Sequence, residues 1–373
     1  MAGLLPYFTK KVYIGIAYSR MNTKGGVLMS KIMKCMLVIV LLILSGCNNN
    51  TDSSIPNIKL GITDETVYIA IMNNDQAAEG TYRTIIGYFS GEGKLLSQEE
   101  FDFGGVYRSE QIDDKIYLVG HDTGILEIDS TNGIMKQVLN VNESDGVKLG
   151  DIIDKYQERL VYLKYTASVE KSRKTKVCTI DMNIVGSEIC TEDFVGAIHD
   201  IAITNDNIFV ILDENGLLIY DYSLHEKDSK VIPTNVNNFQ KGADKIYIVG
   251  GEGYYDIEME QYIQLRSIDN AVSSVKIAGY TVIQSIVEDE KATIISYDLI
   301  TNNYLGETSL DAQSFLVEHS YNDMAVTLRI SSSDIDNGSY IYTLLDISNL
   351  MFVENIHVVI DSNVNPVGFY RVK

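Results

Sequence analysis

Two histidines stand directly beside carboxylates, in His199-Asp200 and in Glu318-His319. A histidine next to a carboxylate can transfer protons near neutral pH, so these residues are the first candidates for catalysis. Both dipeptides lie in sequence typical of β-strands, where adjacent side chains point to opposite faces. Neither dipeptide is therefore expected to form an internal contact. Catalysis would need His199, Asp200 or His319 to meet a residue of another strand, for which Asp151 is a candidate.

Arg108, Asp154 and Lys241 occur in similar strand contexts and could face the same space as the histidines. The alternative is that these polar side chains are only solvated by water. Established catalytic signatures give no help, because no G-x-S-x-G elbow, HExxH motif, phosphate-binding loop or dinucleotide-binding glycine loop occurs in a suitable context. The sequence therefore assigns no catalytic residue.

Two glycine-containing segments resemble ligand-binding loops but fit turns better. The run from Ser331 to Ser339 has a calcium-loop composition, yet its glycine comes one position early and Leu345 stands where the bidentate glutamate belongs. The segment Gly250-Gly251-Glu252-Gly253 has no helix after it to bind a phosphate. Both are predicted to be turns between strands, and no metal or cofactor is expected.

Cys178 and Cys190 flank a probable turn, each six positions from Ile184. In a simple hairpin they would face each other, and a cross-strand pair of this kind can form a disulfide. The alternative is two small apolar residues on one face of a sheet. The spacing fits no zinc motif, because no further Cys or His pair stands nearby.

A recurring unit runs through residues 58–373. Asp114-Lys115-Ile116-Tyr117-Leu118-Val119-Gly120 returns almost unchanged at residues 244–250, and looser copies lie at 66–70, 160–164, 207–211, 280–286 and 324–330. After each copy comes a turn and a second strand that often ends in Asp, whose carboxylate can bond the amides of the next turn. These endings are Asp129, Asp181, Asp221, Asp298 and Asp346.

About seven units of four short antiparallel strands, 35–50 residues apart, predict an all-β fold with a single β-propeller. The pattern resembles YVTN and quinoprotein-like propellers, since it has no Trp-Asp dipeptide. Bound quinone is not expected, because those propellers stack it on Trp and this chain has none. The expected units are 58–102, 103–141, 142–194, 195–234, 235–268, 269–310 and 311–373, with 364–372 joining the first sheet. Consecutive β-sandwiches are the alternative.

The run Leu44-Ser45-Gly46-Cys47 follows a short basic region and the apolar run from Met36 to Leu44. This resembles the lipobox of bacterial lipoproteins. The resemblance implies a signal peptide over residues 29–46, cleavage between Gly46 and Cys47, and a diacylglycerol or fatty acyl group on Cys47. Residues 47–57 would then be a lipidated tether to the domain 58–373. An apolar run this short does not span a bilayer as a helix.

Residues 1–28 do not fit a signal peptide, which normally begins close to its basic region. Lys24-Gly25-Gly26 can be encoded by a ribosome-binding sequence at a normal distance from the Met29 codon. Translation is therefore expected to start at Met29, with residues 1–28 as a wrongly assigned leader.

All 51 acidic residues but only 24 of the 30 basic residues lie after residue 46. The resulting charge of about −27 disfavours nucleic acid and anionic lipid head groups. We expect a lipid-anchored extracytoplasmic propeller that binds a protein or glycan without catalysis. Tyr220, Tyr222, Tyr254 and Tyr255 would form a contact surface or pack between sheets. The alternative is a propeller-type lactonase, lyase or hydrolase.

Overall fold

In a computed structural model, Ser54–Lys373 form one compact unit, which is separate from the residues before it. The predicted leader, the signal peptide, Gly46, Cys47 and most of the tether lie outside the described residues. The structure describes residues 55–372 except 77–80, 102–103, 121–122, 142–146, 168–172, 185, 195, 243–244, 269–270, 312–313, 322–323, 331–338 and 360–363. No helix in this part is long and apolar enough to cross a membrane.

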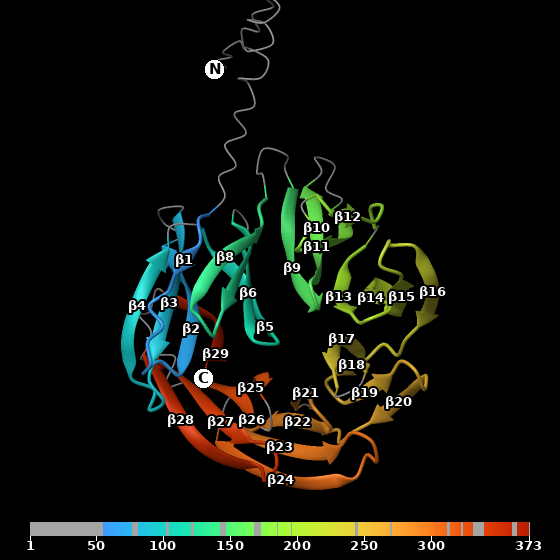
Figure 1. Ribbon diagram of the computed structural model, residues 1–373. Coiled ribbons are helices and arrows are strands. Elements are labelled where there is room, and N and C mark those ends of the chain that lie inside the picture. The colour runs from blue at the N-terminus through green and yellow to red at the C-terminus, as the bar shows by residue number, and fades with distance from the viewer. Residues whose placement is uncertain are drawn as a thin grey trace, which may run out of the picture. The chain divides into compact units, whose positions relative to one another are not determined.

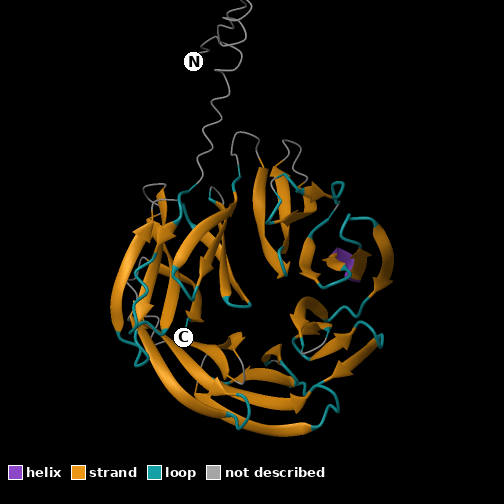
Figure 2. Ribbon diagram, viewed as in Figure 1, coloured by secondary structure: helices purple, strands orange, loops and turns teal. Residues whose placement is uncertain are grey.

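Almost all of the regular structure is antiparallel sheet, with one short 3-10 helix, η2 (Asp213–Asn215), among the described residues (Figure 2). The strands of the described residues form seven sheets, and within each sheet they are ordered from the axis of the ring to its periphery. From the innermost strand outward, the first four sheets along the chain are β29 (Val364–Arg371), β2 (Tyr68–Gln76), β3 (Thr81–Phe89) and β4 (Leu95–Phe101); β5 (Val106–Ile112), β6 (Lys115–Gly120), β7 (Gly124–Asp129), β8 (Ile134–Leu139) and β1 (Ile58–Lys59); β9 (Val147–Tyr156), β10 (Arg159–Ala167), β11 (Arg173–Asp181) and β12 (Ile189–Cys190); and β13 (Ile198–Ile203), β14 (Ile208–Leu212), β15 (Gly216–Tyr220) and β16 (Glu226–Val231).

The other three sheets follow the same order. They are β17 (Val236–Lys241), β18 (Ile246–Gly250), β19 (Gly253–Asp256) and β20 (Gln261–Gln264); β21 (Val272–Ala278), β22 (Thr281–Glu288), β23 (Lys291–Asp298) and β24 (Tyr304–Asp311); and β25 (Ser314–Tyr321), β26 (Met324–Ile330), β27 (Ser339–Asp346) and β28 (Met351–Val359). Every strand that the repeat analysis identified is the second strand of its sheet.

The innermost strands contact one another in a closed cycle, from β29 through β5, β9, β13, β17, β21 and β25 back to β29. The sheets of this unit therefore surround a common axis, with outermost strands such as β4, β16, β24 and β28 at the periphery (Figure 1). This is a β-propeller, as the repeats predicted, and not a row of sandwiches.

Both ends of the described chain pair with sheets far away in sequence. Strand β29 is the innermost strand of the sheet that starts with β2, as predicted for residues 364–372. Strand β1 instead pairs with β8, so one sheet has five strands and the prediction of uniform four-stranded units from residue 58 is wrong. Ile55, assigned to the tether, packs against the same core, because it continues the apolar edge that β1 covers.

The cores lie between neighbouring sheets and explain the continuous apolar runs. In β6, Ile116 and Leu118 pack toward the β2 sheet, whereas Tyr117 and Val119 pack toward the β9 sheet. Successive side chains of a strand point to opposite faces, and here each face meets another sheet. A second strand of this propeller therefore has no solvated face and needs no polar alternation.

Six of the seven described turns between third and fourth strands have an aspartate cap, and the β3–β4 turn has Ser90 in its place. The carboxylate of Asp129 accepts hydrogen bonds from the Thr131 and Asn132 amides, at 2.9 and 3.2 Å, and Asp298 does the same for Ile300 and Thr301. These bonds lower the pKa of Asp298. Corresponding bonds form at Asp181, Asp221, Asp256 and Asp346. The predicted turn capping is confirmed, and Asp256 adds a turn that the sequence analysis missed.

Candidate functional site

Two aspartates on innermost strands tie neighbouring sheets together near the axis. Asp154 on β9 accepts the Ile203 amide of β13 at 2.8 Å, and Asp200 on β13 accepts the Phe239 amide of β17 at 2.6 Å. The second oxygen of each carboxylate accepts the amide of the residue that follows it in sequence. Both aspartates are thus used as connectors between sheets.

The environment of these two carboxylates shifts their pKa values. Burial raises the pKa of Asp200 to about 7, and the charge of Asp154 adds to this shift while the two amide bonds and Arg108 oppose it. Burial also raises the pKa of Asp154, against the stabilising charge of Lys241, whose Nζ lies 2.6 Å from Oδ1. A carboxyl with a pKa near 7 could transfer protons at neutral pH. In Asp200, however, each oxygen already has an amide donor.

Of the other predicted site residues, Lys241 bonds Asp154 and the charge of Arg108 acts on Asp200, but Asp151 and His199 do not join them. His199 Nε2 lies 3.1 Å from Asp213 Oδ1 at the start of η2, and both side chains are about half exposed. Arg108 pairs with Glu110 on its own strand at 3.1 Å, and Asp151 is exposed. In the described part of the chain, no hydrogen bond or ion pair joins Asp151, His199 and Asp200 to one another.

The remaining histidine candidate can be located only by its backbone. Glu318 and His319 lie on β25, where a bulge between Val317 and His319 interrupts the register with β26. Their side chains are outside the described part, as is the loop at residues 331–338. The segment 250–253 forms the predicted turn, between β18 and β19.

The tyrosines proposed as a contact surface are mostly buried. Tyr220, Tyr254 and Tyr255 are less than 8% exposed and belong to cores between sheets. Tyr222 is partly buried, with the Arg159 guanidinium 4.7 Å from its ring centre. A contact surface made of these four residues is therefore wrong, because the strand positions that hold them face neighbouring sheets.

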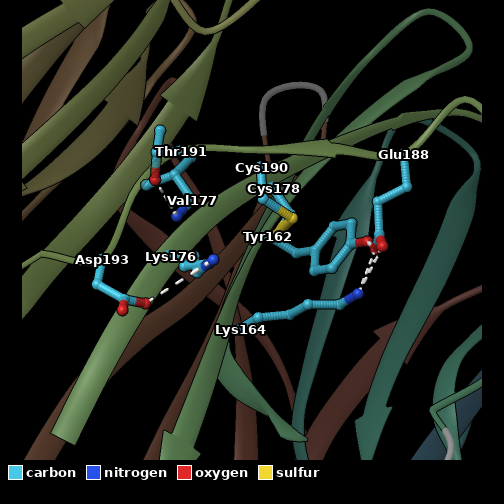
Figure 3. The surroundings of a disulfide bond; sticks show 9 residues. All are labelled: Tyr162, Lys164, Lys176, Val177, Cys178, Glu188, Cys190, Thr191 and Asp193. Carbon is cyan, nitrogen blue, oxygen red and sulfur yellow. Dashed lines mark hydrogen bonds and ion pairs between the residues drawn. A yellow bond between two sulfur atoms is a disulfide. The ribbon is translucent and has the colours of Figure 1, made fainter.

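Cys178 and Cys190 are directly opposite each other on β11 and β12 and form a disulfide, with their Cα atoms 4.1 Å apart (Figure 3). The Thr191 amide bonds the Val177 carbonyl at 2.9 Å beside the pair. This places the cysteines at a non-hydrogen-bonded position, where cross-strand side chains come closest. The disulfide fixes β12, a strand of only two residues, to the rest of its sheet.

Exposed apolar side chains gather on one edge of the sheets. We call this edge the turn face: it carries the turns between first and second strands and between third and fourth strands, which antiparallel order places together. All but two of the large apolar residues that are exposed in the described chain lie there. The exceptions are Val231 and Val272, at the opposite edge. On the turn face are Leu95, Ile134, Ile184, Ile189, Met259, Tyr280, Ile300, Tyr304, Leu305 and Met351.

Several of these residues recur at one structural position, the first residue of the fourth strand of a sheet counted from the axis. Leu95, Ile134, Ile189, Tyr304 and Met351 begin β4, β8, β12, β24 and β28. The five sheets concerned are consecutive around the ring. The most exposed group lies on the β21–β24 sheet, where the Leu299 amide bonds the Tyr280 carbonyl and so joins both turns. The turn face therefore presents an arc of exposed apolar side chains that the repeat analysis did not reveal.

A small pocket of about 160 Å³ opens on the same face, between the β13 and β17 sheets. Phe209, Ile246 and Ile257 form apolar parts of its wall, and Asp206 and Glu258 are polar wall residues. Ligand pockets for metabolites are usually above about 300 Å³. The pocket is therefore smaller than a typical metabolite site.

No family model matches the chain, and no curated protein matches its sequence. Solved structures are similar in fold. Apo AztD from Citrobacter koseri has a TM-score of 0.50 at 13% identity, covering 82% of this chain and 97% of that one. The periplasmic gluconolactonase PpgL of Pseudomonas aeruginosa has a TM-score of 0.52 at 10% identity, covering 81% and 98%. These similarities support the propeller fold.

Proposed function

We propose that the chain is an extracytoplasmic lipoprotein whose propeller binds a partner protein through the turn face, without catalysis. The arc of exposed apolar residues on that face is the observation that carries this proposal. Contiguous apolar surface rimmed by polar residues is a common property of protein interaction sites. The absence of catalysis is supported by the innermost strands, where Asp154 and Asp200 bond backbone amides of neighbouring sheets.

The chemistry of the face favours a protein partner over a glycan. Its most exposed residues are Ile300, Met259 and Met351, at 73%, 68% and 62%. These side chains offer no hydrogen bonds to sugar hydroxyl groups, whereas methionine is enriched in protein interfaces. The strong negative charge of the chain also favours a partner with positive charge, since complementary charge speeds association. The partner should therefore present an apolar patch surrounded by basic residues.

Matched variants test this binding site. Ile300→Ser with Leu305→Ser removes two exposed apolar side chains from the turn face, and Val272→Ser removes one of similar exposure from the opposite edge. Wild type and Val272→Ser should capture the same partner from membranes of the producing cell and bind the purified partner equally. The turn-face variant should bind it at least tenfold more weakly. Equal binding by all three proteins would exclude this surface.

The lipid anchor at Cys47 is the second part of the proposal, and it is supported by the lipobox-like sequence and by the periplasmic location in the description of PpgL. Mass spectrometry of the native protein should find an acylated N-terminal Cys47. Cys47→Ser should move the protein out of the membrane fraction. An unmodified leader on the native protein would refute the anchor and leave the binding proposal to its own test.

Because PpgL is described as a gluconolactonase, lactone hydrolysis is the enzyme activity to test first. We expect no rate above the uncatalysed one, because both oxygens of Asp154 and of Asp200 accept backbone amides. A rate that is abolished by Asp200→Asn would favour the propeller-type enzyme instead.

A further inference from the structure

One face of the β9–β12 sheet gathers two sulfur atoms, a carboxylate, a phenol and an ammonium group (Figure 3). Register places them there. Cys178 is directly opposite Tyr162 on one side and Cys190 on the other. Lys164 and Glu188 each lie two residues from one of these partners, and residues i and i+2 of a strand share a face.

The two Sγ atoms and a Glu188 carboxylate oxygen lie within 4.8 Å of one another. Thiolates and a carboxylate are donors for Zn²⁺, which takes sulfur at about 2.3 Å in tetrahedral geometry. Two thiolates on one ion are then separated by about 3.8 Å, which the opposed cysteines can reach by side-chain rotation. The sequence analysis looked only for a second Cys or His pair and so did not consider Glu188 as a third donor.

The neighbours of Glu188 hold its carboxylate in position. Lys164 Nζ lies 2.6 Å from Oε2, and the Tyr162 hydroxyl donates a hydrogen bond to Oε1. Such bonds orient metal ligands in proteins. They also balance the charge: two thiolates, one carboxylate, one divalent cation and one ammonium group add to zero. Without the cation the same charged groups would carry two net negative charges.

We propose that reduction of the Cys178–Cys190 disulfide creates a binding site for a thiophilic divalent cation such as Zn²⁺, held by both thiolates and Glu188. A dithiol donor supplies two electrons and two protons, breaks the S–S bond and becomes a disulfide itself. The cation then replaces the two thiol protons, which are released to solvent. Three protein ligands leave a fourth position for water, as in exchangeable zinc sites.

The position of the disulfide allows this reaction. Cys190 is exposed on the outermost strand, where a reductant can reach its sulfur, while Cys178 is fully buried. After reduction the segment stays close to β11, because the Thr191 and Phe194 amides bond the carbonyls of Val177 and Thr175. The oxidised protein has no free thiol here, so the redox state decides whether the cation binds.

Cobalt is the probe that separates the outcomes, since cobalt thiolates absorb in the near ultraviolet. The mature chain is reduced with a small dithiol, freed of it without air, checked for native circular dichroism, and titrated with Co²⁺. We expect one Co²⁺ per chain with thiolate charge-transfer absorption, displaced by Zn²⁺, and no such absorption in the oxidised protein. Tighter binding at higher pH should follow from the release of two protons.

Variants assign the ligands. Cys190→Ser should abolish the charge-transfer absorption. Glu188→Gln keeps both cysteines and should weaken Co²⁺ binding about tenfold or more. Glu192→Gln, an exposed acid two residues beyond Cys190, should bind as the wild type does. A natively folded reduced protein without thiolate–cobalt absorption, or equal affinity in wild type and Glu188→Gln, would overturn the proposal.

Discussion

Replacing both Cys178 and Cys190 with alanine tests the structural role of the disulfide. The bond closes a loop with a sequence separation of 12 residues. In the chain-entropy description a loop of this size restricts the unfolded chain by about 3 kcal/mol at 25 °C. Alanine at the fully buried position 178 avoids burying an unpaired hydroxyl and adds only a small loss of packing. The double variant should therefore unfold about 3 kcal/mol more easily than the oxidised wild type.

Urea titration followed by tyrosine fluorescence measures this difference, because the chain has 24 tyrosines and no tryptophan. Reductant should shift the wild type toward the variant and leave the variant unchanged, which separates loss of the bond from loss of side-chain packing. A difference below about 0.5 kcal/mol would refute the reasoning, as it would mean that the unfolded chain gains no freedom when the loop opens. A shift of the variant by reductant would show that another effect is being measured.

Three further changes address the closure of the ring, its tight turns and its charged interior. Deleting residues from Val364 onward removes the innermost strand β29 and should abolish the cooperative urea transition, and a peptide of the deleted residues added in trans should restore part of it. Gly124→Ala should destabilise the protein by at least about 2 kcal/mol more than Gly186→Ala. Both glycines have a φ of +76°, but a Cβ at Gly124 would lie 1.9 Å from the Leu139 carbonyl oxygen, while a Cβ at Gly186 would meet nothing within 4 Å. Equal urea midpoints for the two variants would contradict this. Burial raises the pKa of Asp200 from 3.8 to about 7, so the folded state holds this proton more tightly than the unfolded chain. The resulting stabilisation is complete below about pH 4 and is lost as the pH rises through 7. Asp200→Asn should therefore reduce the change of the urea midpoint with pH between these values. An unchanged pH profile in this variant would contradict the prediction.

The repeats predicted the propeller because a buried second strand leaves a strong trace in sequence. The central residues of the copies, such as 116–119 and 246–249, are all apolar, since their side chains pack against sheets on both faces. The edge strands have weaker patterns. Strand β1 has only two residues, so no pattern could show that it pairs with β8 rather than with the strands that follow it.

The site was harder to predict than the fold. That adjacent residues such as His199 and Asp200 do not pair was predicted from strand geometry, and His199 instead meets Asp213 of η2. The bonds from Asp154 and Asp200 to amides of the next sheet depend on the register between sheets. A single sequence contains no direct signal for this register, so these carboxylates could be proposed as candidates but not recognised as connectors.

The apolar residues that begin the fourth strands are not required by the turns they follow. The aspartate caps bond backbone amides of the turn itself, and the same caps occur before polar starts: Glu226 follows the Asp221 turn and Gln261 follows the Asp256 turn. The fold thus accepts a polar residue at this position in two neighbouring sheets. In the other five sheets the position is apolar, and its side chain exposes apolar surface to water without stabilising the turn. Because the two polar exceptions are neighbours, the five apolar positions remain continuous around the ring. This continuity is expected if a single partner covers the arc.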